Sequence, residues 1–98
     1  MKQAFIDLVK FALKAGHSIS VWDGEEWSTN RSRKFKEIVD DIKGVEEAQI
    51  KIRDIDGNSI GWALISPYGN APDESVIDHS DNEFLNGWFD QYIKSIGG

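Results

Sequence analysis

The sequence predicts an α+β fold in which an antiparallel sheet of up to four strands carries helices on one face. Two pairs of alternating apolar stretches, each joined by an Asp-Gly pair, predict two β-hairpins. Three stretches with apolar residues at every third or fourth position predict helices before, between and after the hairpins. The expected order is α-β-β-α-β-β-α in a single domain, residues 1–98. Residues 18–43 and 48–96 are consistent with a degenerate ββα repeat.

The first helix is expected over residues 2–15, where apolar side chains follow the spacing of one helix face. These side chains are Phe5, Leu8, Val9, Ala12 and Leu13. Gly16 follows at a position where glycine commonly ends a helix. Charged residues interrupt the stretch at Asp7, Lys10 and Lys14, so it lacks the unbroken apolar segment of a signal peptide.

Residues 17–28, here called the first hairpin, predict two short strands around a turn at residues 23–26. This turn would make Trp22 and Trp27 cross-strand neighbours. The simpler interpretation is a structural aromatic pair. The alternative is an exposed indole in a contact site, because tryptophan is enriched at binding hot spots.

Residues 31–43 are expected to form the second helix, with Asn30 or Ser32 as its N-cap. Its predicted buried face consists of Phe35, Ile38, Val39 and Ile42. Its first turns carry four cations, here called the basic cluster: Arg31, Arg33, Lys34 and Lys36. Cations oppose the helix dipole at this end. Either acids such as Glu25 and Glu26 pair with them, or they bind phosphate.

Residues 48–66, here called the central hairpin, carry the strongest strand signal in the chain. A two-residue turn would place Ile52 opposite Gly61, whereas one extra turn residue would place Ile52 opposite Trp62. The longer turn gathers the largest apolar groups on one face, so we predict that register. Trp62 and Trp88 are then expected to be buried together, between the hairpin and the last helix.

The last helix is expected over residues 80–96, where Ser80 and Glu83 match a capping box. Its apolar stripe is broad and aromatic: Phe84, Leu85, Trp88, Phe89, Tyr92, Ile93 and Ile96. Prolines and a glycine within residues 66–72 predict a loop before it. The apolar pair at residues 76–77 is expected to pin that loop to the body of the domain.

The net charge of −6 is unevenly distributed. Residues 1–53 hold ten cations and nine acids, whereas residues 54–98 hold eight acids and only Lys94. The acidity serves solubility or attracts a partner to the C-terminal half. The absence of cysteine excludes disulfide and thiolate chemistry. No apolar run approaches the roughly 20 residues that span a bilayer, so we expect a cytoplasmic protein without a membrane partner.

Two short motifs suggest metals and are rejected. Residues 54–58 resemble the start of an EF-hand calcium loop, but Ser59 and Ile65 occupy the positions that require Gly and Glu. His79 lies near acids, yet a helix cap explains this polarity more simply. No nucleotide-binding, nucleophile-elbow or zinc-protease motif is present. We therefore expect no metal, no cofactor and no enzymatic activity; a metal enzyme built on Asp78, His79 and Asp81 is the least favoured alternative.

Two charged surfaces remain as candidate binding sites. The first, here called the acidic surface, consists of Asp73, Glu74, Asp78, Asp81 and Glu83, followed by Asp90. Such carboxylates attract a basic protein and can imitate the spacing of phosphates. The second is the basic cluster, Arg31 to Lys36, which would bind nucleic acid. Nucleic acid is the less favoured partner, because the net negative charge of the protein repels phosphates.

Residues 61–69 read Gly-Trp-Ala-Leu-Ile-Ser-Pro-Tyr-Gly, and residues 76–78 read Val-Ile-Asp. Together with residues 21–27, these stretches resemble segments of small uncharacterised phage-encoded proteins. The resemblance implies no activity and no functional residue. It favours a phage or prophage accessory protein that binds a host macromolecule in the bacterial cytoplasm. The leading hypothesis is a non-enzymatic inhibitor or binding module whose acidic surface meets a basic host protein.

Overall fold

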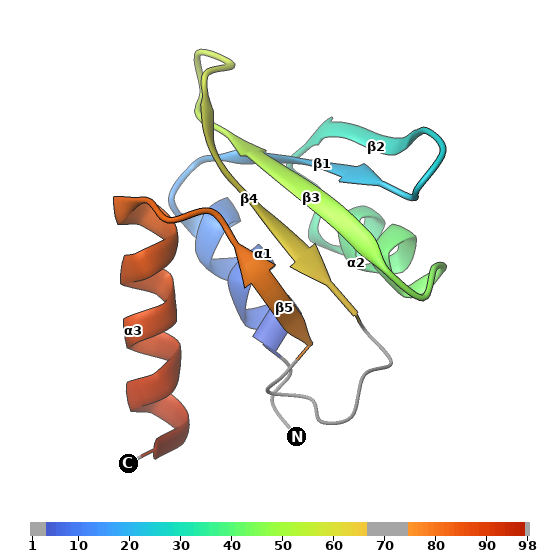
Figure 1. Cartoon of the computed structure of the whole chain (residues 1–98). Coiled ribbons are helices and arrows are strands. Elements are labelled where there is room, and N and C mark those ends of the chain that lie inside the picture. The colour runs from blue at the N-terminus through green and yellow to red at the C-terminus, as the bar shows by residue number, and fades with distance from the viewer. Residues whose placement is uncertain (1–3, 67–74, 98) are drawn as a thin grey trace.

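The computed structural model describes residues 4–66 and 75–97, with three helices and five strands in these ranges (Figure 1). In chain order they are α1 (Ala4–Lys14), β1 (Ser18–Trp22), β2 (Trp27–Ser32), α2 (Phe35–Lys43), β3 (Ala48–Arg53), β4 (Ser59–Ile65), β5 (Val76–His79) and α3 (Glu83–Gly97). The predicted α+β class is confirmed, with five strands in the antiparallel sheet rather than up to four.

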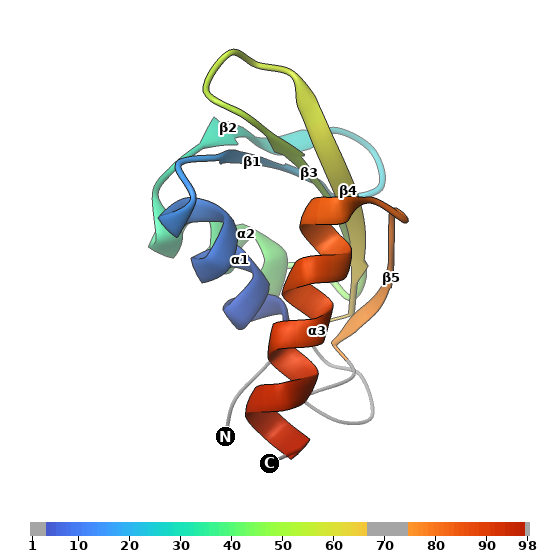
Figure 2. The ribbon, with the colours of Figure 1, turned by 90° about the vertical axis from the view of Figure 1, so that its left-hand side faces the viewer.

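The strands follow the order β2-β1-β3-β4-β5, and every neighbouring pair is antiparallel. β1 of the first hairpin pairs with β3 of the central hairpin, so the two hairpins form one continuous sheet. The helices gather on one side of this sheet (Figure 2). The predicted layering, with helices on one face only, is therefore confirmed for the described residues.

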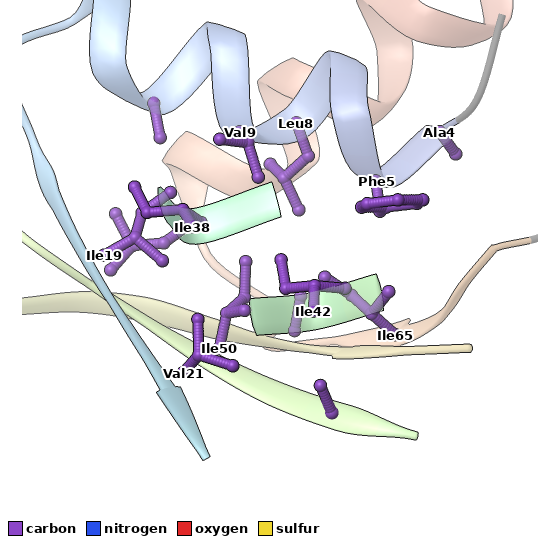
Figure 3. Packing of buried hydrophobic residues seen from close by; sticks show 14 of the residues in the cluster. Ala4, Phe5, Leu8, Val9, Ile19, Val21, Ile38, Ile42, Ile50 and Ile65 are labelled. Carbon is purple, nitrogen blue, oxygen red and sulfur yellow. The ribbon is translucent and has the colours of Figure 1, made fainter. Parts of the chain in front are cut away.

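Strand alternation directs one set of side chains into a core shared with the helices (Figure 3). In β3, Ile50 and Ile52 are fully buried, whereas Gln49, the residue before Ile50, is exposed. α1 contributes Phe5 and Leu8 to the same core. Burying these aliphatic and aromatic side chains is the main stabilising term of the fold, at about 1.5–3 kcal/mol for each large side chain.

Trp88 anchors α3 to this core. Its ring stacks on Tyr92 with 5.5 Å between ring centroids. Its Nε1–H donates to Asp7 of α1 at 2.9 Å, so the polar edge of the buried indole is satisfied. The predicted burial of Trp88 is confirmed, since only 1% of its surface is exposed.

The predicted register of the central hairpin is wrong. Ile52 pairs with Gly61, as in the register of the shorter turn, and an irregularity in the ladder follows where Arg53 pairs with Ser59. The inward set is therefore Ile50, Ile52, Ala63 and Ile65, all fully buried. Trp62 points to the other face and is 37% exposed, so its predicted burial is also wrong.

The start of α3 explains this register. A Cβ atom on Gly61 would lie 2.7 Å from Ser80 Oγ and 2.8 Å from Leu85 Cδ1, inside the contact limit of both atoms. An inward indole at this point of the sheet would collide with α3. The physical reason for the wrong prediction is that it maximised apolar area within the hairpin and ignored the space taken by the helix.

Three predictions about the second helix are wrong: its first residue, the burial of Phe35 and its N-cap. Arg31 and Ser32 belong to β2, so α2 begins only at Phe35, which is itself 37% exposed and lies off the core face. Lys34 precedes α2 without a side-chain cap, although its N–H donates to Ser32 Oγ at 3.1 Å. The strand continues because Ser20 Oγ, buried on β1, accepts the N–H of Arg31 at 2.9 Å.

The predicted capping box at Ser80 is wrong as well. α3 begins at Glu83, and Asn82 caps it by accepting the N–H of Leu85 at 3.3 Å. Ser80 Oγ is engaged elsewhere, because it accepts the N–H of Trp62 at 3.1 Å. The apolar pair at residues 76–77 belongs to β5 and extends the sheet beyond β4. The loop that it was expected to pin lies, apart from Ser66, outside the described residues.

We predict that Trp88→Ala lowers the free energy of unfolding by about 3–5 kcal/mol, the usual cost of truncating a buried indole. Trp62→Ala is the matched control and should cost only about 1 kcal/mol, because Trp62 is partly exposed. Urea unfolding of both variants measures the difference. Equal losses would contradict the assignment of the two tryptophans to opposite faces.

Two glycine substitutions should act in opposite directions. Gly61→Ala should destabilise the fold by about 1–3 kcal/mol, because the added methyl overpacks the contact with Ser80 and Leu85. Gly87→Ala should stabilise it by up to about 1 kcal/mol, since Gly87 lies in α3 with open space around its Cα. Thermal unfolding of the two variants tests the pair, and a stable Gly61→Ala protein would refute the close packing of α3 on β4.

Candidate functional site

The sheet surface opposite the helices is the candidate site, here called the helix-free face. It is formed by the outward residues of the strands, among them Trp22, Gln49, Lys51, Trp62 and Leu64. Trp62 is 37% exposed, and Trp27 at the edge of the face is 43% exposed. Large exposed apolar groups gathered on one face are typical of interaction surfaces, whereas scattered ones are not.

The first hairpin holds two of the three indoles. Trp22 and Trp27 pair across the strands and their rings meet edge to face, with 5.2 Å between centroids. The sequence-based prediction that they are cross-strand neighbours is confirmed. Edge-to-face packing of this kind adds about 0.5–1.5 kcal/mol beyond the buried area, so the pair presents a preformed aromatic edge.

The turn between them is held by Asp23. Its Oδ1 accepts the N–H groups of Glu25 and Glu26, both at 2.9 Å. The hydrogen bond from Glu26, followed by that from Glu25, lowers the pKa of the Asp23 carboxyl. The carboxylate therefore fixes the turn that brings the two tryptophans together.

A hollow of about 420 Å³ lies between the indoles. Its lining consists of Trp22, Trp27, Gln49, Lys51 and Trp62. A volume of this size falls within the range of small-ligand sites, which is about 300–1,000 Å³. The lining is aromatic at its edges and polar at its floor, so it suits a flat ring that also carries polar groups.

Lys51 is the charged group of this hollow. It pairs with Trp62 across β3 and β4, and with Ser20 across β1 and β3. Among the residues that the structure describes, no carboxylate forms an ion pair with Lys51. Its ammonium is therefore available to an anionic group placed over the hollow.

Two arginines extend the positive charge along the same face. Arg53 follows Lys51 by two residues on β3, and its Nη1 donates to the carbonyl oxygen of Gly57 at 3.3 Å. The guanidinium of Arg31 also packs against Gly57, with Nη2 3.1 Å from where a Cβ would stand. The turn of the central hairpin thus gathers Arg31 and Arg53 at one end of the helix-free face.

The basic cluster does not form a helix N-terminus as predicted. Arg31 lies in β2 with a φ of 52°, and its side chain turns toward the central hairpin. Arg33 and Lys34 lie between β2 and α2, and Lys36 lies in the first turn of α2. All four side chains are exposed. The helix-free face therefore takes Arg31 from the cluster and adds two cations, Lys51 and Arg53, that the sequence analysis did not single out.

The acidic surface is described only in part, because Asp73 and Glu74 lie outside the described residues. Asp78 pairs with Leu64 at the β5 edge, and its Oδ1 accepts the N–H of its neighbour His79 at 2.9 Å. Asp81 Oδ1 accepts an amide N–H of Asn86 at 2.8 Å. Asp78, Asp81 and Glu83 are all exposed around the start of α3.

Neither suspected metal motif assembles a ligand set. Asp54 Oδ1 accepts the N–H groups of Asn58 at 2.9 Å and Asp56 at 3.0 Å, so it closes a turn. His79 packs against the rings of Trp88 and Phe89. Within residues 4–66 and 75–97, no three His, Asp or Glu side chains gather to hold a metal ion.

Comparison of the chain with models of protein families, with curated proteins and with solved structures finds no match. In the part of the chain that the structure describes, every helix is too short or too polar to cross a membrane.

The central turn should give an acid-sensitive contribution to stability. The hydrogen bond from Asn58, and then that from Asp56, hold the pKa of Asp54 below its ordinary 3.8. A lowered carboxyl pKa stabilises the fold above about pH 4, and this contribution is lost as the pH falls through the lowered pKa. Asp54→Asn should therefore flatten the pH dependence of the unfolding free energy between about pH 4 and pH 2.

The neighbouring carboxylate provides the control for this experiment. Asp56→Asn changes the same net charge in the same turn, but the oxygen that accepts the turn N–H groups belongs to Asp54. Urea unfolding across the acid range should leave the Asp56→Asn profile parallel to that of the unmodified protein. If both variants gave profiles parallel to that of the unmodified protein, protonation of Asp54 would make no contribution to the unfolding free energy.

Proposed function

We propose that this protein is a non-enzymatic binding module and that its ligand lies on the helix-free face of the sheet. The observation that carries the proposal is the grouping of Trp22, Trp27 and Trp62 around one hollow on a face that no described helix covers. Tryptophan supplies large contact area at low entropic cost, and it dominates the binding energy of many interfaces.

The fold supports such a role because the face is rigid. Trp22 lies on β1 and Lys51 on β3. Each of these strands has a strand neighbour on both sides, and their pairing joins the two hairpins. Trp62 lies on β4, whose backbone is bonded on one side to β3 and on the other to β5 and Ser80. A preformed site loses less conformational entropy on binding than a loop does.

A second candidate is a basic protein partner at the acidic surface. Its support within the described residues is the exposure of Asp78, Asp81 and Glu83 around the start of α3. The charge of residues 54–98 would speed association with a basic partner. The resemblance to phage-encoded proteins adds the proposal that this partner belongs to a bacterial host.

Site-specific photo-crosslinking separates the two surfaces. A photoreactive benzoylphenylalanine in place of Trp62 samples the helix-free face, and the same residue in place of Asp81 samples the acidic surface. Phe89, which is 45% exposed on α3, gives the matched control position. We expect ultraviolet irradiation in bacterial lysate to give defined adducts from position 62 only. Nuclease and protease digestion of each adduct then identify its chemical class.

The outcome is decisive in either direction. Adducts from position 81 without any from position 62 would replace the helix-free face with the acidic surface. Equal yields of adducts from positions 62, 81 and 89 would indicate non-specific contact and contradict a defined binding site. Far-ultraviolet circular dichroism of each variant confirms that the substituted protein keeps its fold.

A further inference from the structure

We propose that the ligand of the helix-free face is single-stranded nucleic acid, an inference that rests on the binding role proposed above. The indoles would stack on bases, and Lys51 with the two arginines would contact phosphates. Aromatic side chains interleaved with cations on an open surface are the two elements that bind single strands without a sequence requirement.

The arrangement of the aromatic groups supports stacking. Trp22 pairs with Gln49, and Trp62 pairs with Lys51 two residues further along β3. The strand spacing and the rise per residue place the Cα atoms of Trp22 and Trp62 about 12 Å apart. The hollow of about 420 Å³ between them leaves room for a flat base above Lys51.

The local charge is complementary to a phosphate backbone although the whole protein is acidic. Lys51 lies at the centre of the face, and Arg31 and Arg53 lie beside the central turn. Acids lie at the rim of the face. Asp23, Glu25 and Glu26 lie in the turn of the first hairpin, Asp54 and Asp56 lie in the central turn, and Asp78 lies on β5. A strand that runs from Trp22 past Lys51 toward the arginines would meet three cations, with Asp23, Asp54 and Asp56 in the turns at the two ends of its path.

The same geometry disfavours a duplex. Bases of double-stranded DNA are stacked on each other, so their faces are not available to an indole. The helix-free face is a sheet surface without a described helix that could enter a major groove. Binding should therefore require unpaired bases in addition to phosphates. This requirement distinguishes a single-stranded nucleic acid from a polyanion that has no bases.

Fluorescence anisotropy with a labelled oligothymidylate of about 12 nucleotides tests the proposal. We expect binding at about 50 mM salt that weakens steeply by about 200 mM. Trp62→Ala should weaken binding about tenfold through lost stacking. Lys51→Gln should lower the slope of log affinity against log salt by about 0.7, the share of one phosphate contact on a single strand.

Matched controls come from the helix side of the domain. Phe89→Ala removes an exposed aromatic ring from α3, and Lys94→Gln removes an exposed cation from its last turn. Both variants should bind like the unmodified protein. An abasic strand of the same length keeps the phosphates without the bases, and the corresponding duplex keeps the bases stacked. Both probes should bind at least tenfold more weakly than oligothymidylate.

Each outcome decides the question. Absence of oligothymidylate binding at about 50 mM salt, or equal binding by the abasic strand, overturns the proposal. Binding that survives Lys51→Gln and Trp62→Ala but fails in Lys36→Gln assigns the contact to the basic cluster and also overturns it. Protein adducts at position 62 without oligothymidylate binding would sustain the binding role of the face and refute only its nucleic-acid ligand.

Discussion

The contact between Gly61 and the start of α3 is the constraint on which both faces of the sheet depend. Ser80 Oγ and Leu85 Cδ1 occupy the space that a side chain at position 61 would need. Gly61 must therefore face the helices, and strand alternation then directs Ala63 and Ile65 into the core. The same alternation directs Trp62 outward, so core packing and the helix-free face follow from a single choice of register.

The segment before α3 also holds the outward tryptophan in position. The N–H of Trp62 donates to Ser80 Oγ at 3.1 Å, and its carbonyl oxygen accepts the N–H of Ser80 at 2.9 Å. Ser80, which was predicted to cap the helix, is instead hydrogen-bonded to β4, and Asn82 caps α3. The core and the candidate contact surface use alternate residues of the same strand, so β4 exposes an indole without opening the core.

Local patterns predicted the elements of the fold well. The periodicity of residues 2–15 predicted α1, and the turn at residues 23–26 predicted the pairing of Trp22 with Trp27. Both follow from interactions within a few residues. The candidate site was predicted only in fragments: Arg31 was identified as a cation, but Lys51 was not, because a single lysine in a strand gives no signal until its neighbours across the sheet are known.

The sequence by itself determined the α+β class and the order of the three helices and the two hairpins along the chain, because side-chain periodicity and turn residues act locally. The tertiary structure alone decided the hairpin register, the strand status of Arg31 and the pairing of β5 with β4. It also decided that Trp62 joins the first hairpin on the helix-free face instead of joining Trp88 in the core. Each of these depends on the space left by residues distant in the chain, and excluded volume between distant residues leaves no periodic trace in the sequence.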